Sequence, residues 1–148
     1  MPDDDTALLF HHPSRRVGRT KLRAFLAELT ERVVGGRNVT CLITTDRKLR
    51  ALNRKFLGHD YATDVLSFPS QESNDSLGEI AISFDRAVAQ ASEFGHAVED
   101  ELRILMLHGV LHLAGMDHEA DSGAMARTEI RWRKRLGLPP GLIERVSA

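Results

Sequence analysis

Three histidines within eleven residues are the strongest chemical signal in this sequence. His108 and His112 are four residues apart, so on a helix they lie one above the other on one face. Gly115 can end that helix in a left-handed turn, after which the chain can return and bring His118 toward the first two. Three neutral imidazoles that converge on one point are typical of a catalytic zinc site with a fourth position left for water. The spacing therefore predicts one zinc ion per chain, bound by His108, His112 and His118.

A buried helix with incidental histidines is the alternative explanation, but two ionisable rings are costly to bury in the apolar segment 104–114. The spacing matches His-x-x-x-His-x-x-Gly-x-x-His of metzincin proteases, except that Gly109 stands where they carry a glutamate. Either a zinc-bound hydroxide acts with little help, or another carboxylate moves protons, and the candidates are Asp64, Asp117 and Glu119. Asp117 can instead orient a ligand histidine. The missing glutamate weakens the case for peptide hydrolysis and leaves phosphodiester hydrolysis open, where metal and arginine neutralise charge.

Composition indicates one soluble globular domain over residues 1–148, with flexible tails at 1–6 and from about 138 to 148. Apolar content is 42%, charged content is 28% and the net charge is −1, so any anion binding must come from local patches. The single cysteine, Cys41, excludes a disulfide framework and is expected to be a small core residue. The sequence shows neither a basic segment before an apolar run nor about 18 consecutive apolar residues, so we expect a cytoplasmic protein without membrane contact.

Hydrophobic periodicity predicts an α/β (α+β) domain of four strands and five helices. Strands are expected over residues 7–10, 38–44, 65–68 and 77–83, and the last two are expected to form a hairpin. Helices are expected over residues 19–34, 46–56, 84–94, 98–114 and 122–136. The helix over 98–114 is apolar nearly all round, which indicates a central helix buried on several sides. It would carry the two metal histidines on a rigid element.

Two of the predicted helices have basic faces. Asp46 is expected to cap the second helix, whose core stripe is Leu49, Leu52 and Phe56. Its opposite face carries Arg47, Arg50 and Arg54, which is either an anion-binding stripe or a solvated face. In the last helix we expect Met125, Trp132 and Leu136 to point inward. Its outer face is expected to be basic, with Arg127, Arg131, Arg133, Lys134 and Arg135.

Three segments resemble the YbeY family, bacterial metal-dependent endoribonucleases named as ribosomal RNA maturation factors. They are residues 52–56 with 63–69, residues 77–83, and residues 108–118, of which the last is the most specific. The resemblance implies a single α/β domain with a small mixed sheet and implies His108, His112 and His118 as zinc ligands. It also implies processing of the small-subunit ribosomal RNA and ribosome quality control, with precursor RNA and the ribosome or its proteins as partners and no DNA.

The sequence departs from the family at position 57. Many members have an arginine, usually assigned to the active site, directly after the aromatic residue that is Phe56 here, whereas this chain has Leu57. Ala62 also replaces a common proline. We expect Arg54, one helical turn earlier, to take over the neutralisation of a substrate phosphate. Two alternatives remain open: a zinc peptidase, and a ribosome-associated binding protein whose structural zinc needs a fourth protein ligand.

Overall fold

The computed structural model describes residues 7–14, 17–61, 63–71, 76–116 and 123–139 of the chain. Within this part of the chain the strands and helices occur in the order that the sequence predicts, and their ends differ from the predicted ones by at most two residues. The elements are β1 (Ala7–Phe10), α1 (Arg19–Val34), β2 (Asn38–Thr44), α2 (Asp46–Leu57), β3 (Val65–Pro69), β4 (Ser76–Ser83), α3 (Phe84–Phe94), α4 (Val98–Leu113) and α5 (Ala124–Leu136).

The four strands form one mixed sheet in the spatial order β1-β2-β4-β3. β1, β2 and β4 are parallel, and β3 pairs antiparallel with β4 through the predicted hairpin. β3 is therefore an edge strand, and it ends at Pro69, which has no N–H to donate and suits an edge position. The expected α/β architecture with a small mixed sheet is confirmed.

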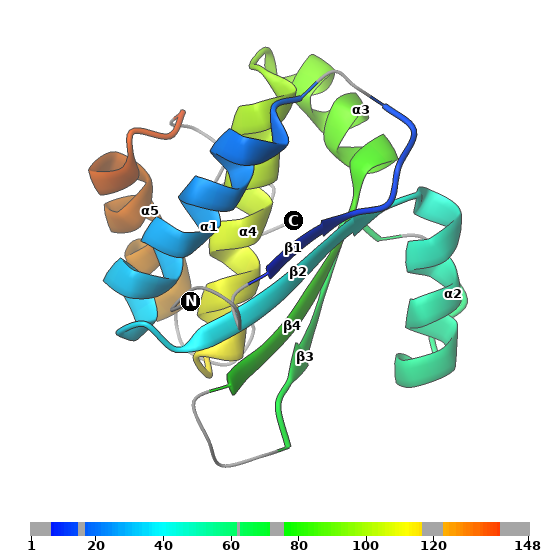
Figure 1. Ribbon diagram of the computed structural model, residues 1–148, viewed down its shortest axis with the longest axis horizontal. Coiled ribbons are helices and arrows are strands. Elements are labelled where there is room, and N and C mark those ends of the chain that lie inside the picture. Colours follow the sequence, from blue (N-terminus) through cyan, green and yellow to red (C-terminus); the bar gives the residue numbers. More distant parts are fainter. Residues whose placement is uncertain (1–6, 15–16, 62, 72–75, 117–122, 140–148) are drawn as a thin grey trace.

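Helices cover the two faces of the sheet unequally (Figure 1). α1, α3, α4 and α5 lie on one face, and α2 lies alone on the other. α4 packs against α1, α3 and α5 and also against β3 and β4, with Leu102, Met106 and Leu107 fully buried. The prediction of a central apolar helix is confirmed. No helix in the described residues is long and apolar enough to cross a membrane.

The helix caps agree with the sequence at α3 and differ at α2. The Ser83 hydroxyl accepts a hydrogen bond from the Arg86 amide and caps α3, as predicted. The prediction that Asp46 caps α2 is wrong, because the cap is Thr45, whose backbone is extended and whose hydroxyl accepts from the Lys48 amide. Asp46 is the first helical residue, and its carboxylate accepts from Arg86 and the Ser83 hydroxyl.

Three further expectations about burial need correction. Phe56 was expected in the core stripe of α2 but is 57% exposed, because α2 is alone on its face and Asn53 takes the buried position. Arg133 was expected on a basic outer face of α5 but is only 3% exposed, because it pairs with the buried Glu129. Leu138, at the start of the expected C-terminal tail, is buried in the core. Residues 1–6 and 140–148 lie outside the described residues.

Candidate functional site

His108 and His112 occupy successive turns of α4 and lie close together, as their spacing predicts. Their ring centroids are 5.6 Å apart with the planes at 58°. Both residues are half-buried on a helix whose other faces are packed in the core. A buried, packed helix limits the freedom of the two rings, so their donor atoms are held in a narrow range of positions.

A buried carboxylate contacts the Nδ1 atom of His108. Oε1 of Glu129, on α5, lies 2.8 Å from Nδ1 of His108, and Oε2 accepts a hydrogen bond of 2.5 Å from the Arg133 guanidinium. Glu129 is fully buried, and the side chain of His108 is 18% exposed. The three side chains therefore form a chain of contacts that runs from the interior of α5 to the histidine face of α4.

The charge state of Glu129 determines which nitrogen of His108 carries the proton. Burial raises the pKa of Glu129, but the hydrogen bond and charge of His108 and the charge and hydrogen bond of Arg133 together outweigh burial and lower it. An ionised carboxylate has no proton to donate, so Nδ1 of His108 must be the donor. Nε2 is then the nitrogen that can present a lone pair to a metal.

Gly109 faces the sheet, in close contact with β4. A Cβ atom at this position would stand 2.9 Å from Cγ2 and 3.0 Å from Cδ1 of Ile80 on β4. The Gly109 carbonyl accepts a 3.3 Å hydrogen bond from the hydroxyl of Ser67 on β3. A glutamate, as metzincin proteases have beside their first histidine, would not fit between this helix and the sheet without displacing one of them.

The described hydrogen bonds of Asp64 are with Gln90 and Ser83, and none joins it to His108 or His112. Asp64 immediately precedes β3. Its carboxylate accepts a hydrogen bond from the side chain of Gln90 on α3, and its backbone carbonyl accepts one from the Ser83 amide. Ser67, which contacts the turn of α4 that carries His108, is three residues further along the strand, a distance of about 10 Å in extended chain. The described contacts of Asp64 fasten the start of β3 to α3.

The predicted basic stripe lies on α2, across the sheet from α4 (Figure 1). Arg47, Arg50 and Arg54 are all exposed, and Arg50 pairs with Asp60 at 3.0 Å. The sheet thus separates Arg54 from His108 and His112. The C-terminal parts of α2 and α4 nevertheless both lie near the end of β3. Phe56 of α2 contacts Phe68 on one face of this strand, and Gly109 of α4 contacts Ser67 on the other.

Three other candidates, His118, Asp117 and Glu119, lie outside the described residues, as does Ala62. Within the described ranges no group of three or more histidine, cysteine, aspartate or glutamate side chains could hold a metal. Two of the three predicted zinc ligands are thus placed side by side, and the metal site stays a prediction. Cys41 is buried, and burial raises its pKa to about 12, which confirms a core residue.

Sequence reasoning missed Glu129 and Arg133, although the sequence contains a signal for them. Met125, Glu129 and Arg133 follow one another at intervals of four, so a helix places all three on one side. Met125 was expected to point inward, so Glu129 and Arg133, which lie on the same side of the helix, are expected to point inward as well. A glutamate and an arginine on a buried side are expected to pair with each other or with a functional group.

Comparisons with known proteins agree over most of the chain. The family described as "Endoribonuclease YbeY" matches residues 14–137. A protein of that name from Solibacter usitatus is 52% identical over 145 residues, which cover 98% of this chain and 97% of the relative. Another from Koribacter versatilis is 47% identical, covering 88% and 86%. The solution structure of TM1509 from Thermotoga maritima superposes with a TM-score of 0.61 at 29% identity, covering 87% of this chain and 88% of that one.

Proposed function

Since the chain belongs to the YbeY family of endoribonucleases, we propose that it is a metal-dependent enzyme that hydrolyses single-stranded RNA. The observation that carries the proposal is the histidine pair on α4, with His108 held by the buried Glu129–Arg133 pair. Histidines that bind a metal commonly donate their other ring N–H to a carboxylate, which orients the ring. We propose as substrate the precursor of the small-subunit ribosomal RNA, processed in the cytoplasm with the ribosome or its proteins, in ribosomal RNA maturation and ribosome quality control.

We propose that His108, His112 and His118 bind one zinc ion per chain. The two described ligands suit zinc, because both are half-buried imidazoles on one face and His108 has its Nδ1 engaged by Glu129. When bound by three histidines, zinc lowers the pKa of a water ligand to about 7 and so supplies hydroxide at neutral pH. The contact with Glu129 would orient the His108 ring with Nδ1 as the donor, which leaves Nε2 for the metal.

The close packing of Gly109 supports phosphodiester hydrolysis over peptide hydrolysis. A peptidase of this histidine spacing relies on a glutamate at that position, and Ile80 leaves no room for one. In phosphodiester hydrolysis, charge neutralisation at the phosphate carries much of the barrier, so a carboxylate at position 109 is not required. Asp117, Glu119 and Asp64 remain the predicted candidates for a general base, and Asp117 is also a candidate to orient a histidine.

We also propose that Arg54 contacts a phosphate of the RNA, in place of the arginine that many relatives have at position 57. Arg54 is exposed, and an RNA strand that crosses the edge of β3 would pass both it and the histidine face. Arg54→Ala should slow cleavage by roughly ten- to a thousand-fold, the scale of one transition-state charge contact, without change in zinc content. Adding Leu57→Arg to the Arg54→Ala variant should recover part of the lost cleavage rate. Arg47→Ala, at the other end of α2, is the matched control, and equal rates for both variants would exclude the role of Arg54.

The proposed function is tested with the zinc-loaded protein, a structured RNA and casein, each with and without a chelator. We expect internal cleavage of single-stranded regions of the RNA, its loss with chelator and in His112→Ala, and no cleavage of casein. Casein cleavage that disappears in His112→Ala, with the RNA left intact, would identify a peptidase. Tight RNA binding without cleavage of either substrate would identify a binding protein with structural zinc.

A further inference from the structure

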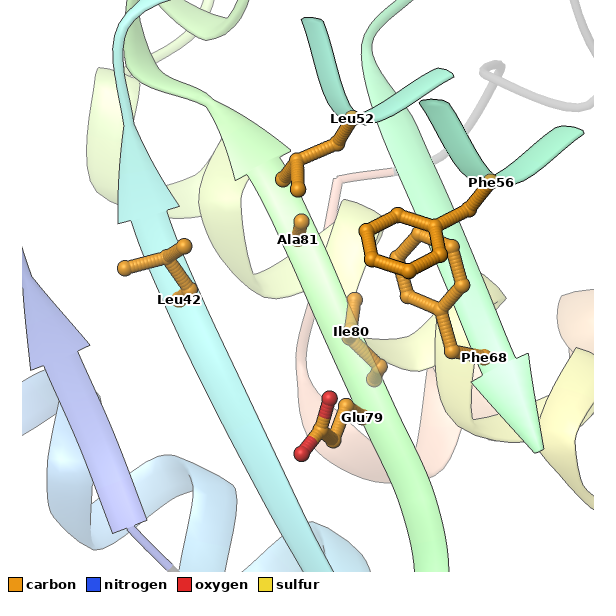
Figure 2. A pocket seen from close by; sticks show the side chains of 7 residues that line it. All are labelled: Leu42, Leu52, Phe56, Phe68, Glu79, Ile80 and Ala81. Carbon is orange, nitrogen blue, oxygen red and sulfur yellow. The ribbon is translucent and has the colours of Figure 1, made fainter. Parts of the chain in front are cut away.

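An apolar groove lies between α2 and the sheet, on the face opposite α4. Its volume is about 250 Å³, below the range of roughly 300–1,000 Å³ that is common for drug-sized ligands, so it suits a smaller group. Figure 2 shows its lining side chains, with Phe56 of α2 lying against Phe68 of β3. The two rings are 5.7 Å apart at 68°. The lining residues are Leu42, Leu52, Phe56, Phe68, Glu79, Ile80 and Ala81.

Glu79 is the charged residue of this lining. It stands on the central strand β4, in register with Thr40 of β2 and Phe68 of β3, and it is exposed. Among the described residues, none forms a hydrogen bond or an ion pair with its carboxylate. An ionised carboxylate in an otherwise apolar groove offers two hydrogen-bond acceptors to a ligand that brings its own donors.

Exposed aromatic rings and a cation lie at the end of α2 and in the residues that follow it, beginning with Phe56 of the groove lining. Phe56, Leu57 and Tyr61 are three of the six large hydrophobic residues that are exposed in the described part of the chain. The Lys55 ammonium lies 5.2 Å from the centre of the Phe56 ring, and the rings of His59 and Tyr61 are 5.3 Å apart. Exposed aromatic rings beside a cation are the usual means of binding single-stranded RNA, because bases stack on the rings and phosphates pair with the cation.

The groove and the histidine face lie on opposite sides of the edge strand β3. Phe68 points into the groove, and its neighbour Ser67 donates to the Gly109 carbonyl on the other face of the sheet. No strand of the described chain lies beyond β3 on this side. An RNA strand that leaves the groove therefore has only β3 to pass before it reaches the turn of α4 that carries His108.

We propose that this groove binds one unpaired nucleobase of the RNA substrate, packed against Phe56 and Phe68 and hydrogen-bonded to Glu79. Guanine is favoured, because its N1–H and N2–H donors lie side by side and match the two oxygens of a carboxylate, whereas uracil offers a single N–H donor. The Lys55 ammonium pairs with a phosphate beside this base. This inference rests on the proposed function, since it assumes that the substrate is RNA, and it adds a base preference at a distance from the cleaved bond.

The test measures the binding of fluorescein-labelled oligouridylates, with and without one guanine, to the zinc-loaded full-length protein by fluorescence anisotropy. The RNA is checked for intactness after each measurement. We expect the guanine-containing RNA to bind roughly five- to a hundred-fold more tightly, the scale of one bidentate contact to a base. Glu79→Gln should reduce this preference to less than about three-fold, because an amide cannot accept both hydrogen bonds.

Phe56→Ala should weaken the binding of both RNAs by roughly ten-fold, the scale of one stacked base. The matched controls are Phe94→Ala and Glu93→Gln, which remove an exposed aromatic ring and an exposed carboxylate on α3, outside the groove. Both should bind as the unmodified protein does. Because Phe56 and Glu79 are exposed, neither substitution removes a core contact, and thermal unfolding verifies that the variants are folded.

The outcomes separate this inference from the proposed function. If the protein cleaves RNA but Phe56→Ala and Glu79→Gln keep the affinity and base preference of the unmodified protein, the nucleobase site is refuted and the nuclease remains. Such a result would assign the groove to another occupant, such as an apolar protein segment. If no RNA is cleaved but the guanine preference exists and disappears in Glu79→Gln, the nucleobase site is supported and the proposed chemistry fails.

Discussion

Replacing Glu129 with alanine removes the carboxylate that His108 and Arg133 share, and the structure predicts two separable losses. Glu129 is fully buried and Arg133 is 3% exposed, so the substitution leaves a guanidinium buried without its counter-charge. Removing one partner of a buried ion pair costs about 3–5 kcal/mol. A domain of this size has about 5–15 kcal/mol of stability, so the variant should fold with a midpoint temperature lower by roughly 10 °C.

The second loss concerns metal binding, because His108 is no longer held with its proton on Nδ1. Loss of a carboxylate that orients a ligand histidine lowers metal affinity by roughly ten- to a hundred-fold. The double variant Glu129→Leu/Arg133→Met separates the two effects. It buries no lone charge, so most of the stability should return, whereas zinc affinity should stay low.

Urea unfolding of the metal-free protein, followed by circular dichroism, measures the first effect, and competition with a chromophoric chelator measures the second. Glu28→Ala is the matched control, because Glu28 and Arg32 form the same i,i+4 pair on the exposed side of α1. That pair is worth less than about 1 kcal/mol, and its loss should leave zinc binding unchanged. A Glu129→Ala variant no less stable than Glu28→Ala would refute the stabilising role of the Glu129–Arg133 pair. A double variant that binds zinc as tightly as the unmodified protein would refute the role of Glu129 in metal binding.

Three further predictions concern packing and titration. Gly109→Ala should destabilise the protein by about 1 kcal/mol in urea, because overpacking against Ile80 costs about 1–3 kcal/mol and outweighs the better helix propensity of alanine, about 1 kcal/mol. The loss should shrink in an Ile80→Ala background, which removes the three Ile80 carbons that the new methyl group would meet, and an unchanged loss there would contradict the packing argument. The pKa of Asp85 is lowered although burial raises it, because the Asp46 amide and the His12 ring bond its carboxylate; a lowered folded-state pKa adds stability above the ordinary value of 3.8, so the deficit of Asp85→Asn at pH 7 should fade below about pH 4, and a constant deficit would exclude this linkage. Cys41, with its pKa raised to about 12 by burial, should resist a thiol reagent in the native protein and react once per chain in denaturant; rapid native labelling would show that the core opens.

The sequence predicts the elements well because their ends carry local signals. Ser83 and Gly95 mark the two ends of α3, and the hydrophobic period of α4 is too continuous for a surface helix. Which of two adjacent residues caps α2 was not predictable, because Thr45 and Asp46 both have suitable side chains and the choice depends on what Ser83 and Arg86 bond.

Contacts between distant segments account for what sequence reasoning missed at the site. The pairing of Glu129 with His108 joins α5 to α4 across twenty-one residues, and no local pattern in either helix specifies it. Likewise, the arginine stripe of α2 was correctly placed on one face of its helix, but the sequence does not say on which face of the sheet α2 lies. The sequence alone does not show why a glycine stands at position 109; the structure does, because a side chain there would meet Ile80 of β4.

We propose that one metal ion held by His108, His112 and His118 gives the chain its ability to cut RNA. The most direct test of this proposal is a titration of the metal-free protein with zinc while the initial rate of cleavage of a single-stranded RNA is recorded. We expect the rate to rise in proportion to added zinc, to reach a plateau at about one ion per chain, and to stay at the background in His112→Ala at every zinc concentration. A rate that is independent of zinc, or an equal plateau in His112→Ala, would contradict the proposal.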